Sequence, residues 1–295
     1  MKTKFAVEDL TIHRIIEIEE PATGPGYSPK EFFPDLTPEM LEENRGWMTG
    51  NGLDKEHGNI LLCFQSYILR TPHHNILVDS CIGNDKNFPT RPNWHKRADG
   101  GNYMRQLAEA GLKVEDIDFV MCSHLHPDHV GWNTRLENGR WVPTFPKARY
   151  LFSQRELDYW TAEHKKTPIT YMDDSVLPII AANRADLVKS DHALDDHVHL
   201  VPTPGHSPDH FAVHAGKRAA GAVFTGDCIH SPLQARYPEL GMRADWDRKM
   251  GAQSRRKFLE HYCDSETLFC AMHFPSPSVG HLKRWGEGFR LSYVE

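Results

Sequence analysis

The segment Ser123–His129, with the sequence SHLHPDH, limits the possible folds and functions of this chain more than any other stretch. Three histidines and one aspartate lie within six residues, directly after the apolar run 117–122. An apolar run that ends in polar residues is typical of a buried strand with a site at its carboxyl end. Histidine and carboxylate are ligands of the same divalent metals, and a core hardly accommodates four such groups unless something binds them. The segment therefore predicts a site for more than one metal ion. A solvated histidine-rich loop is the alternative, because the chain has 19 histidines.

Four other apolar segments end in a similar way. Asp79 closes the segment 75–79, and His206 follows the segment 198–201 in the turn PTPGHS. Asp227 closes the segment 222–227, and His273 closes the segment 267–273. Any one of these fragments is a weak signal, but five in this order are a strong one.

The order strand, His-x-His-x-Asp-His and Gly131, followed by the later strand ends, resembles the pattern of the metallo-β-lactamase superfamily. The resemblance covers roughly residues 60–281. It implies an α/β fold, an αββα sandwich of two mixed β-sheets flanked by helices, which no internal repeat shows independently. We expect a single domain over residues 1–295, with an N-terminal extension at 1–50 and the motif-bearing core at 60–281.

The resemblance also implies a cofactor of two divalent metal ions, with zinc as the first choice and iron, manganese or cobalt as alternatives. It assigns Asp79 a supporting role beside the ligands, although a strand-end aspartate that caps a turn explains it equally well. One ion would take three histidines, the other would take a second set, and one aspartate would bridge them. The first ion would be held by His124, His126 and His206, the second by Asp128, His129 and His273, and the bridging residue would be Asp227.

Such a site implies hydrolysis by a metal-bound hydroxide, because two ions roughly 3.5–4 Å apart lower the pKa of a shared water. Asp128 and Asp227 are the expected catalytic carboxylates, and Asp128 could also pass a proton to the leaving group. His230 is both a catalytic and a substrate-binding candidate. Trp94, Trp132 and His281 are further substrate-binding candidates. An equally good interpretation of His230 and His281 is that they are loop residues whose hydrogen bonds are satisfied within the protein.

The residues HFPSPSVGH at 273–281 are similar to those of the methyl-parathion-hydrolase branch, with its lactonase and arylesterase relatives. We therefore expect hydrolysis of a small-molecule carboxylic ester or lactone, with phosphotriesters as additional substrates. A thioesterase of the glyoxalase II type is the first alternative. A diiron oxidoreductase and a binding protein that keeps the fold are two others.

Composition limits the partners. The formal net charge is −6 and no basic block is present, which disfavours nucleic-acid binding. No apolar run approaches 20 residues, so we expect no membrane partner. The N-terminus turns acidic too early for a signal peptide, and the six cysteines form no C-x-x-C pair. These features predict a cytoplasmic enzyme, and a homodimer is one possible assembly.

Capping residues and apolar runs predict several elements. Thr37 and Pro38 are typical of a helix start, and Ser153 to Glu156 of another. The remaining expected elements are strands at 11–18, 60–69, 75–79, 149–152, 211–214 and 222–225, and helices at 103–110 and 248–262. Residues 164–197 have no readable pattern beyond helical pieces near 176–182.

Overall fold

Two mixed β-sheets form the framework of the chain in the computed structural model, which describes residues 2–22, 28–217 and 220–294. The chain divides into two compact units. The N-terminal unit consists of Thr3–Glu17 and Phe64–His192. The C-terminal unit consists of Met1–Lys2, Ile18–Cys63 and Ala193–Glu295.

The sheet of the N-terminal unit has the strand order β1-β2-β3-β4-β5-β8-β9. Its strands are β1 (Lys4–Val7), β2 (Leu10–Pro21), β3 (Leu61–Arg70), β4 (Asn75–Val78), β5 (Phe119–Met121), β8 (Arg149–Ser153) and β9 (Ala185–Val188). The strands β4, β5, β8 and β9 pair in parallel, whereas β3 and β4 form an antiparallel hairpin. Carboxyl ends of parallel strands meet at one edge of a sheet, so the residues after β4 and β5 become neighbours.

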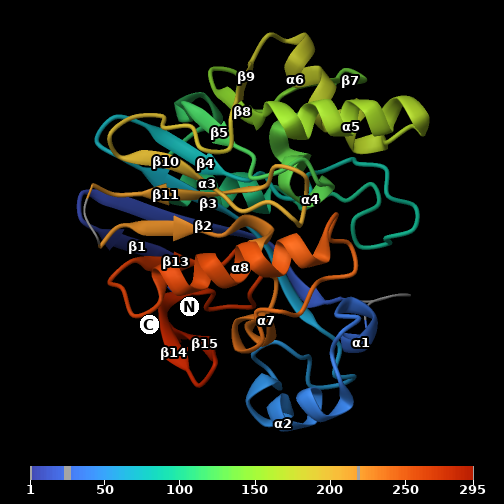
Figure 1. Cartoon of the computed structure of the whole chain (residues 1–295). Coiled ribbons are helices and arrows are strands. Elements are labelled where there is room, and N and C mark those ends of the chain that lie inside the picture. Colours follow the sequence, from blue (N-terminus) through green and yellow to red (C-terminus); the bar gives the residue numbers. More distant parts are fainter. Residues whose placement is uncertain (1, 23–27, 218–219, 295) are drawn as a thin grey trace. The chain divides into compact units, whose positions relative to one another are not determined.

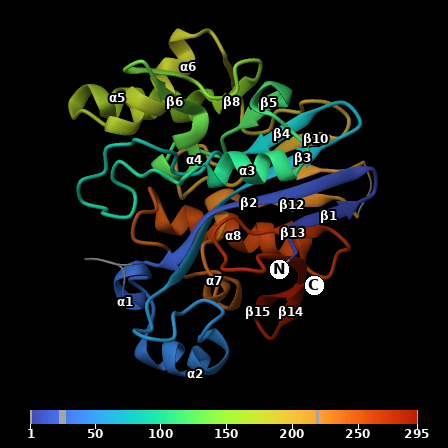
Figure 2. The same cartoon turned by 180° about the vertical axis from the view of Figure 1, so that it is seen from behind.

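Helices cover this sheet through a common apolar core. The helices are α3 (Asn102–Glu109), α4 (Pro127–Val130), α5 (Gln154–Lys166) and α6 (Leu177–Ala181), with a π-helix at Met172–Val176 and 3-10 turns at Val114–Asp116 and Gly131–Asn133. A small hairpin is formed by β6 (Thr134–Glu137) and β7 (Arg140–Pro143). Leu107 of α3 and Leu157 of α5 belong to one buried cluster with Val120 of β5. Figure 2 shows α3 lying across the strands of this sheet.

The sheet of the C-terminal unit has the order β10-β11-β12-β13-β14-β15. Its strands are β10 (Val198–Pro202), β11 (Phe211–Ala215), β12 (Ala222–Phe224), β13 (Leu268–Cys270), β14 (Val279–Trp285) and β15 (Gly288–Tyr293). Only β12 and β13 pair in parallel within this described sheet. Their carboxyl ends therefore place the residues that follow them, including Asp227 and His273, at the same edge.

Among its described residues, the C-terminal unit has four helices, together with a 3-10 turn at Gly226–Cys228. They are α1 (Pro29–Phe32), α2 (Pro38–Met48), α7 (Pro232–Arg236) and α8 (Arg248–Tyr262). Phe258 and Leu259 of α8 are buried in one cluster with Val223 and Phe269 of the sheet. Figure 1 shows α8 running beside this sheet.

Most of the expected elements are confirmed. The helix 248–262 has the predicted bounds, and Thr37 and Ser153 accept the capping hydrogen bonds expected of them. The sequence patterns did not indicate β9 or the final pair β14 and β15. Of the expected N-terminal extension, β1 and most of β2 belong to the sheet of the N-terminal unit, and the predicted domain boundaries stay a prediction. No helix among the described residues has the length and apolar character needed to cross a membrane.

Candidate metal centre

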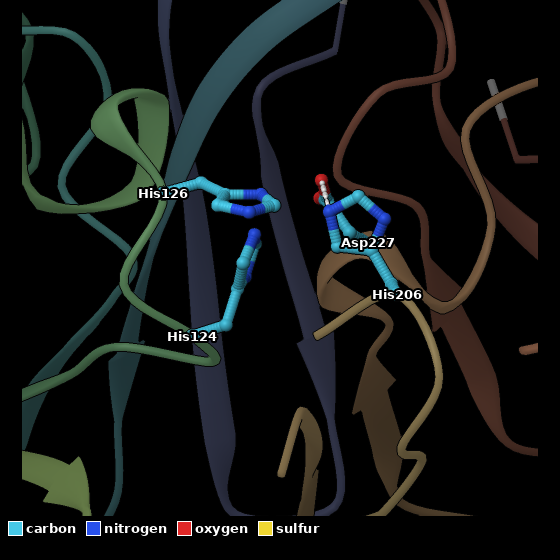
Figure 3. A group of neighbouring side chains, drawn as sticks. All are labelled: His124, His126, His206 and Asp227. Atoms are coloured by element: carbon cyan, nitrogen blue, oxygen red, sulfur yellow. Dashed lines mark ion pairs between the residues drawn. The ribbon is translucent and has the colours of Figure 1, made fainter. Parts of the chain in front are cut away.

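The N-terminal unit brings the residues of the SHLHPDH segment together at the end of β5. His126 is the N-cap of α4 and Pro127 opens that helix, while the carbonyl of His126 accepts a hydrogen bond of 3.0 Å from the amide of His129. The ring centroid of His124 lies 4.5 Å from that of His126 and 4.2 Å from that of His129. His124 and His126 also present ligand atoms within 4.8 Å of each other (Figure 3). This is the spacing needed for two ligands of one ion.

Close packing after α4 explains the glycine of this motif. The amide of Gly131 donates to the carbonyl of Cys81 over 2.8 Å, which holds the motif against the loop after β4. A Cβ atom at Gly131 would lie 1.8 Å from the carbonyl oxygen of Ile82. Only glycine therefore permits this approach of the two backbones.

Asp79 supports the histidines from behind, as the resemblance implied. Its carboxylate accepts hydrogen bonds from the Ser123 amide over 2.7 Å and the Ser123 hydroxyl over 2.9 Å. It also lies 2.9 Å from Nδ1 of His129, and Nδ1 of His124 lies 3.0 Å from the Ser123 hydroxyl. Asp79 is fully buried. Because Nδ1 of both rings is engaged on this side, Nε2 is the atom directed at a ligand.

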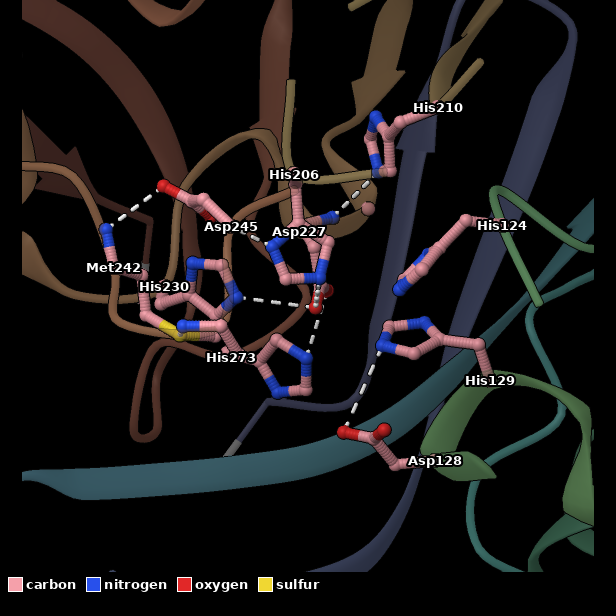
Figure 4. Close-up of polar contacts among 12 residues, drawn as sticks. His124, Asp128, His129, His206, His210, Asp227, His230, Met242, Asp245 and His273 are labelled. Atoms are coloured by element: carbon pink, nitrogen blue, oxygen red, sulfur yellow. Dashed lines mark hydrogen bonds and ion pairs between the residues drawn. The ribbon is translucent and has the colours of Figure 1, made fainter. Parts of the chain in front are cut away.

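Asp128 differs from the buried residues around it. Its Oδ2 lies 3.7 Å from Nε2 of His129, and its side chain is 15% exposed, whereas that of His129 is fully buried (Figure 4). Asp128 can therefore act as a ligand and still exchange a proton with solvent.

The C-terminal unit gathers a second set of donors around Asp227, in the turn after β12. Oδ2 of Asp227 lies 3.1 Å from Nε2 of His206 and 3.1 Å from Nε2 of His230, and its Oδ1 lies 2.8 Å from Nε2 of His273 (Figures 3 and 4). All four side chains are at most 4% exposed. Three histidines thus direct Nε2 at one carboxylate.

An outer layer fixes these rings. Nδ1 of His206 lies 2.9 Å from Oδ1 of Asp245, and Nδ1 of His273 lies 3.0 Å from the carbonyl oxygen of Cys63. The amide of Asp227 donates to Nε2 of His210 over 2.8 Å. Histidines that bind metals usually donate their second N–H to a carboxylate or carbonyl in this way. The donor chemistry of the described residues therefore fits a divalent metal.

Charges within the C-terminal unit agree with that fit. Burial lowers the pKa of His206, but Asp227 and Asp245 outweigh burial and raise the pKa to about 9. A protonated His206 therefore balances the two buried carboxylates in the metal-free chain. Burial lowers the pKa of His230 despite the attraction of Asp227. A divalent cation would replace the proton on His206, because a metal ligand must be the neutral imidazole.

The four substrate-binding candidates are placed differently. His230 contacts Asp227, as described above. Trp132 is 5% exposed, donates to Glu17 over 2.7 Å and stacks on Tyr103, so little of its surface is left for a substrate. Trp94 packs edge-on against Phe64 and Phe88, and His281 pairs with Ser292 across β14 and β15. Their substrate roles stay predictions.

Two contacts of the ligand residues could not be predicted. Asp245 lies in the segment before α8, and its hydrogen bond to His206 joins residues 39 positions apart. Trp160 packs against the core, as its place on a helix suggests, but its ring also lies edge-on to His126 with centroids 5.3 Å apart. Neither contact has a local sequence signal.

Comparisons with known proteins identify relatives. The model of the family described as "Metallo-beta-lactamase superfamily" matches residues 65–260. An N-acyl homoserine lactonase of Bacillus cereus is 28% identical over 176 residues, which is 56% of this chain and 64% of that protein. One of Bacillus thuringiensis is 27% identical over 166 residues, 53% of this chain and 60% of that protein. The matches thus span less than two thirds of these relatives.

Solved structures with the same fold cover nearly the whole chain. The hydrolase AbOPH, of the beta-lactamase superfamily, has a TM-score of 0.80 at 21% identity and covers 99% of this chain and 97% of its own. AidC, a dizinc quorum-quenching lactonase in complex with a product, has a TM-score of 0.75 at 22% identity, with 99% and 98% covered. These identities support the fold alone.

Proposed function

Because the chain belongs to the metallo-β-lactamase superfamily and has its fold, with mixed sheets and flanking helices, we propose that it is a dinuclear metal-dependent hydrolase that opens a lactone or a related carboxylic ester. The proposal depends on one observation above all. In four histidines of the family's ligand pattern, Nδ1 already contacts another residue, so Nε2 is the atom available to a metal ion. These histidines are His124, His129, His206 and His273. N-acyl homoserine lactonases among the relatives support the ester chemistry.

We propose the ligand set that the family pattern implies. One ion is held by three histidines, the second by an aspartate and two histidines, and Asp227 bridges them. The ligands of the first ion are His124, His126 and His206, and those of the second are Asp128, His129 and His273. Zinc suits imidazole and carboxylate ligands best. When bound, two such ions polarise the ester carbonyl and lower the pKa of a water.

The side chains of the site have distinct tasks in this proposal. Asp128, the most exposed carboxylate of the set, is suited to deliver a proton to the leaving alkoxide of the opened ring. Nε2 of His230 lies 3.1 Å from the bridging carboxylate and can hold Asp227 in one orientation. Trp160, edge-on to His126, is available as part of an apolar wall for an acyl chain.

The experiment is a substrate panel on metal-loaded protein. It includes γ- and δ-lactones with short and long acyl chains, aryl esters, thioesters, β-lactams and phosphotriesters. We expect lactones to be hydrolysed fastest and a chelator to abolish the activity. Preference for thioesters would favour the glyoxalase II alternative, and oxygen consumption without hydrolysis would favour a diiron oxidoreductase. Full activity after complete metal removal would falsify the proposed function.

A matched pair of variants tests the bridging residue. Asp227→Asn keeps the shape of the side chain but removes the charge that a bridging ligand needs, so activity on the best lactone should fall by about 100-fold or more. Asp264→Asn is the control, since Asp264 is 57% exposed in the same unit and asparagine tolerates its positive φ of 56°. Equal activities of the two variants would rule out the bridging role.

A further inference from the structure

The N-terminal unit has an apolar groove beside α3, the helix that lies across its sheet in Figure 2. Met104 and Leu107 line the groove from α3, and Leu112 and Val114 line it from the turn after that helix. Its volume is about 440 Å³. Sites for small molecules in proteins have volumes of roughly 300–1,000 Å³, so the groove is large enough for such a ligand.

Trp132 also lines the groove and is fixed from behind. Its Nε1 donates to Oε1 of Glu17 over 2.7 Å, and its ring stacks on that of Tyr103 with centroids 4.9 Å apart. Oε1 of Glu17 also lies 3.0 Å from Nη1 of Arg97. The polar atom of the indole is thus satisfied inside the protein, and the remaining surface of Trp132 is apolar. A surface fixed in this way loses little entropy when a ligand binds.

The apolar lining is mostly aliphatic and only partly buried. Met104 and Val114 pack against the core but keep part of their surface, and Ala108 of α3 is exposed. Covering such surface with an alkyl chain is favourable in proportion to the apolar area removed from water. Methionine has three rotatable bonds and adapts to an irregular neighbour. The lining therefore suits a flexible alkyl chain.

The polar residues that line the groove, among those described, are two cations, Lys113 and Arg135. Lys113 is exposed and forms no ion pair within the described part of the chain. Nη1 of Arg135 donates to the carbonyl of Thr144 over 3.2 Å, and its Nη2 lies 3.8 Å from Oε1 of Glu137. A guanidinium has five N–H donors, so these contacts leave others for a ligand. The chain as a whole has a net charge of −6, so cations alone beside an apolar groove are a local feature that calls for an anion.

We infer that this groove binds the anion of a medium-chain fatty acid, with its alkyl chain on the aliphatic lining and its carboxylate at Lys113 and Arg135. Arginine suits the carboxylate because its planar N–H groups match the two oxygens. The inference goes beyond the proposed function and does not depend on it, because none of the residues that line the groove belongs to the metal ligand set.

The first experiment compares ligands on the metal-loaded wild type by isothermal titration calorimetry, below the concentrations at which they form micelles. Decanoate should bind, whereas decylammonium, which has the same chain and the opposite charge, should not. Octanoate should bind about 4-fold or more weakly than decanoate, because each CH2 group covered by the groove contributes about 2- to 4-fold. Decanoate should also shift the indole N–H signal of Trp132 in nitrogen-15 NMR, assigned with Trp132→Phe.

The variants locate the carboxylate. Lys113→Met and Arg135→Met keep an apolar stem and remove one charge each, so each should weaken decanoate about 2- to 5-fold. Ala108→Glu places a like charge in the groove at an exposed helix position and should weaken decanoate further. Arg140→Met is the matched control, because Arg140 is an exposed cation of the same β6–β7 hairpin as Arg135 and does not line the groove.

Each outcome supports or overturns the inference. Decylammonium that binds as tightly as decanoate overturns it, and this result needs no variant to fold. A carboxylate can also bind divalent metals, so equal affinities in the wild type, Lys113→Met and Arg135→Met would place decanoate at the metal centre and overturn the inference. An equal loss in Arg140→Met would show a general effect of charge and overturn it as well. A wild-type dimer that Ala108→Glu separates, without decanoate binding, would assign the groove to a second copy of the chain instead.

Discussion

Asp79 shows how much one buried side chain can determine at the residue scale. It holds His129 directly and His124 through Ser123, and it also accepts the Ser123 amide. Each buried donor left without an acceptor costs about 1–3 kcal/mol. We therefore expect Asp79→Ala to lower the free energy of unfolding by about 3 kcal/mol even without metal, as measured by urea denaturation.

Asp118→Ala is the control for this prediction. Asp118 also accepts a backbone amide, that of Asn75, but at an exposed position where water can replace it. Its loss should cost less than about 1 kcal/mol. A similar cost for the two variants would mean that Asp79 acts only as an ordinary strand-end residue, which is the alternative that the sequence left open.

At the scale of elements, Lys86 joins the loop after β4 to the π-helix Met172–Val176. Its Nζ is fully buried and lies 2.7 Å from Oγ1 of Thr134, 3.5 Å from Oδ1 of Asp174 and 3.8 Å from the centroid of the Trp141 ring. Burial lowers the pKa of Lys86 to about 8, although Asp174 opposes the shift. Burying the Lys86–Asp174 pair therefore costs free energy of desolvation, but removing one of the two charges costs more.

We expect Lys86→Met to lower the free energy of unfolding by about 3 kcal/mol, because it leaves the Asp174 carboxylate buried without its cation. Adding Asp174→Asn should recover part of that loss, which a double-mutant cycle in urea would measure. Lys166→Met, which breaks an exposed pair with Glu163, is the control and should cost less than about 1 kcal/mol. Additive losses for Lys86 and Asp174 would contradict the coupling.

His214 couples β11 to β10 and α8 and makes stability depend on pH. It faces His199 across the strand pair, its Nδ1 lies 3.2 Å from the hydroxyl of Tyr262, and His261 is the other charged neighbour. Burial, with smaller contributions from His199 and His261, lowers the pKa of His214 from 6.5 to about 4. Between pH 6.5 and 4 the unfolded chain therefore binds more protons than the folded one.

It follows that the His214 contribution to stability is complete above pH 6.5 and is lost as the pH falls toward 4. His214→Gln should flatten the fall in unfolding free energy over that range, measured by denaturation at a series of pH values. His57→Gln, on the surface with a side chain 65% exposed, should leave the slope as it is in the wild type. An unchanged slope in His214→Gln would show that the pKa of His214 is the same in the folded and the unfolded chain.

The same scale explains which elements the sequence predicts. Helix α8 has an aspartate cap and a long mixed-charge pattern, and the ligand strands end in polar residues, so local rules identify both. Strand β9 has no buried residue and no alternation of buried and exposed side chains. It is a strand because it pairs with β8, which a local sequence pattern does not indicate. The contact of Asp245 with His206 could not be predicted for the same reason, since the two residues lie 39 positions apart and no local pattern indicates the contact.

For the molecule as a whole, metal binding should act as a stabilising ligand. Under the proposed function the ions bind the folded chain, in which Nδ1 of His124, His129, His206 and His273 is engaged by other residues, and not the unfolded chain. Free zinc at 100 times its dissociation constant then adds about 2.7 kcal/mol to the free energy of unfolding. We expect zinc to raise the melting temperature of the wild type, measured by calorimetry, and a chelator to reverse the increase. Asp227→Asn should show a much smaller increase, whereas Asp264→Asn should match the wild type. An equal increase in Asp227→Asn would place the stabilising zinc elsewhere, because a bridging carboxylate cannot lose its charge without weakening both ions.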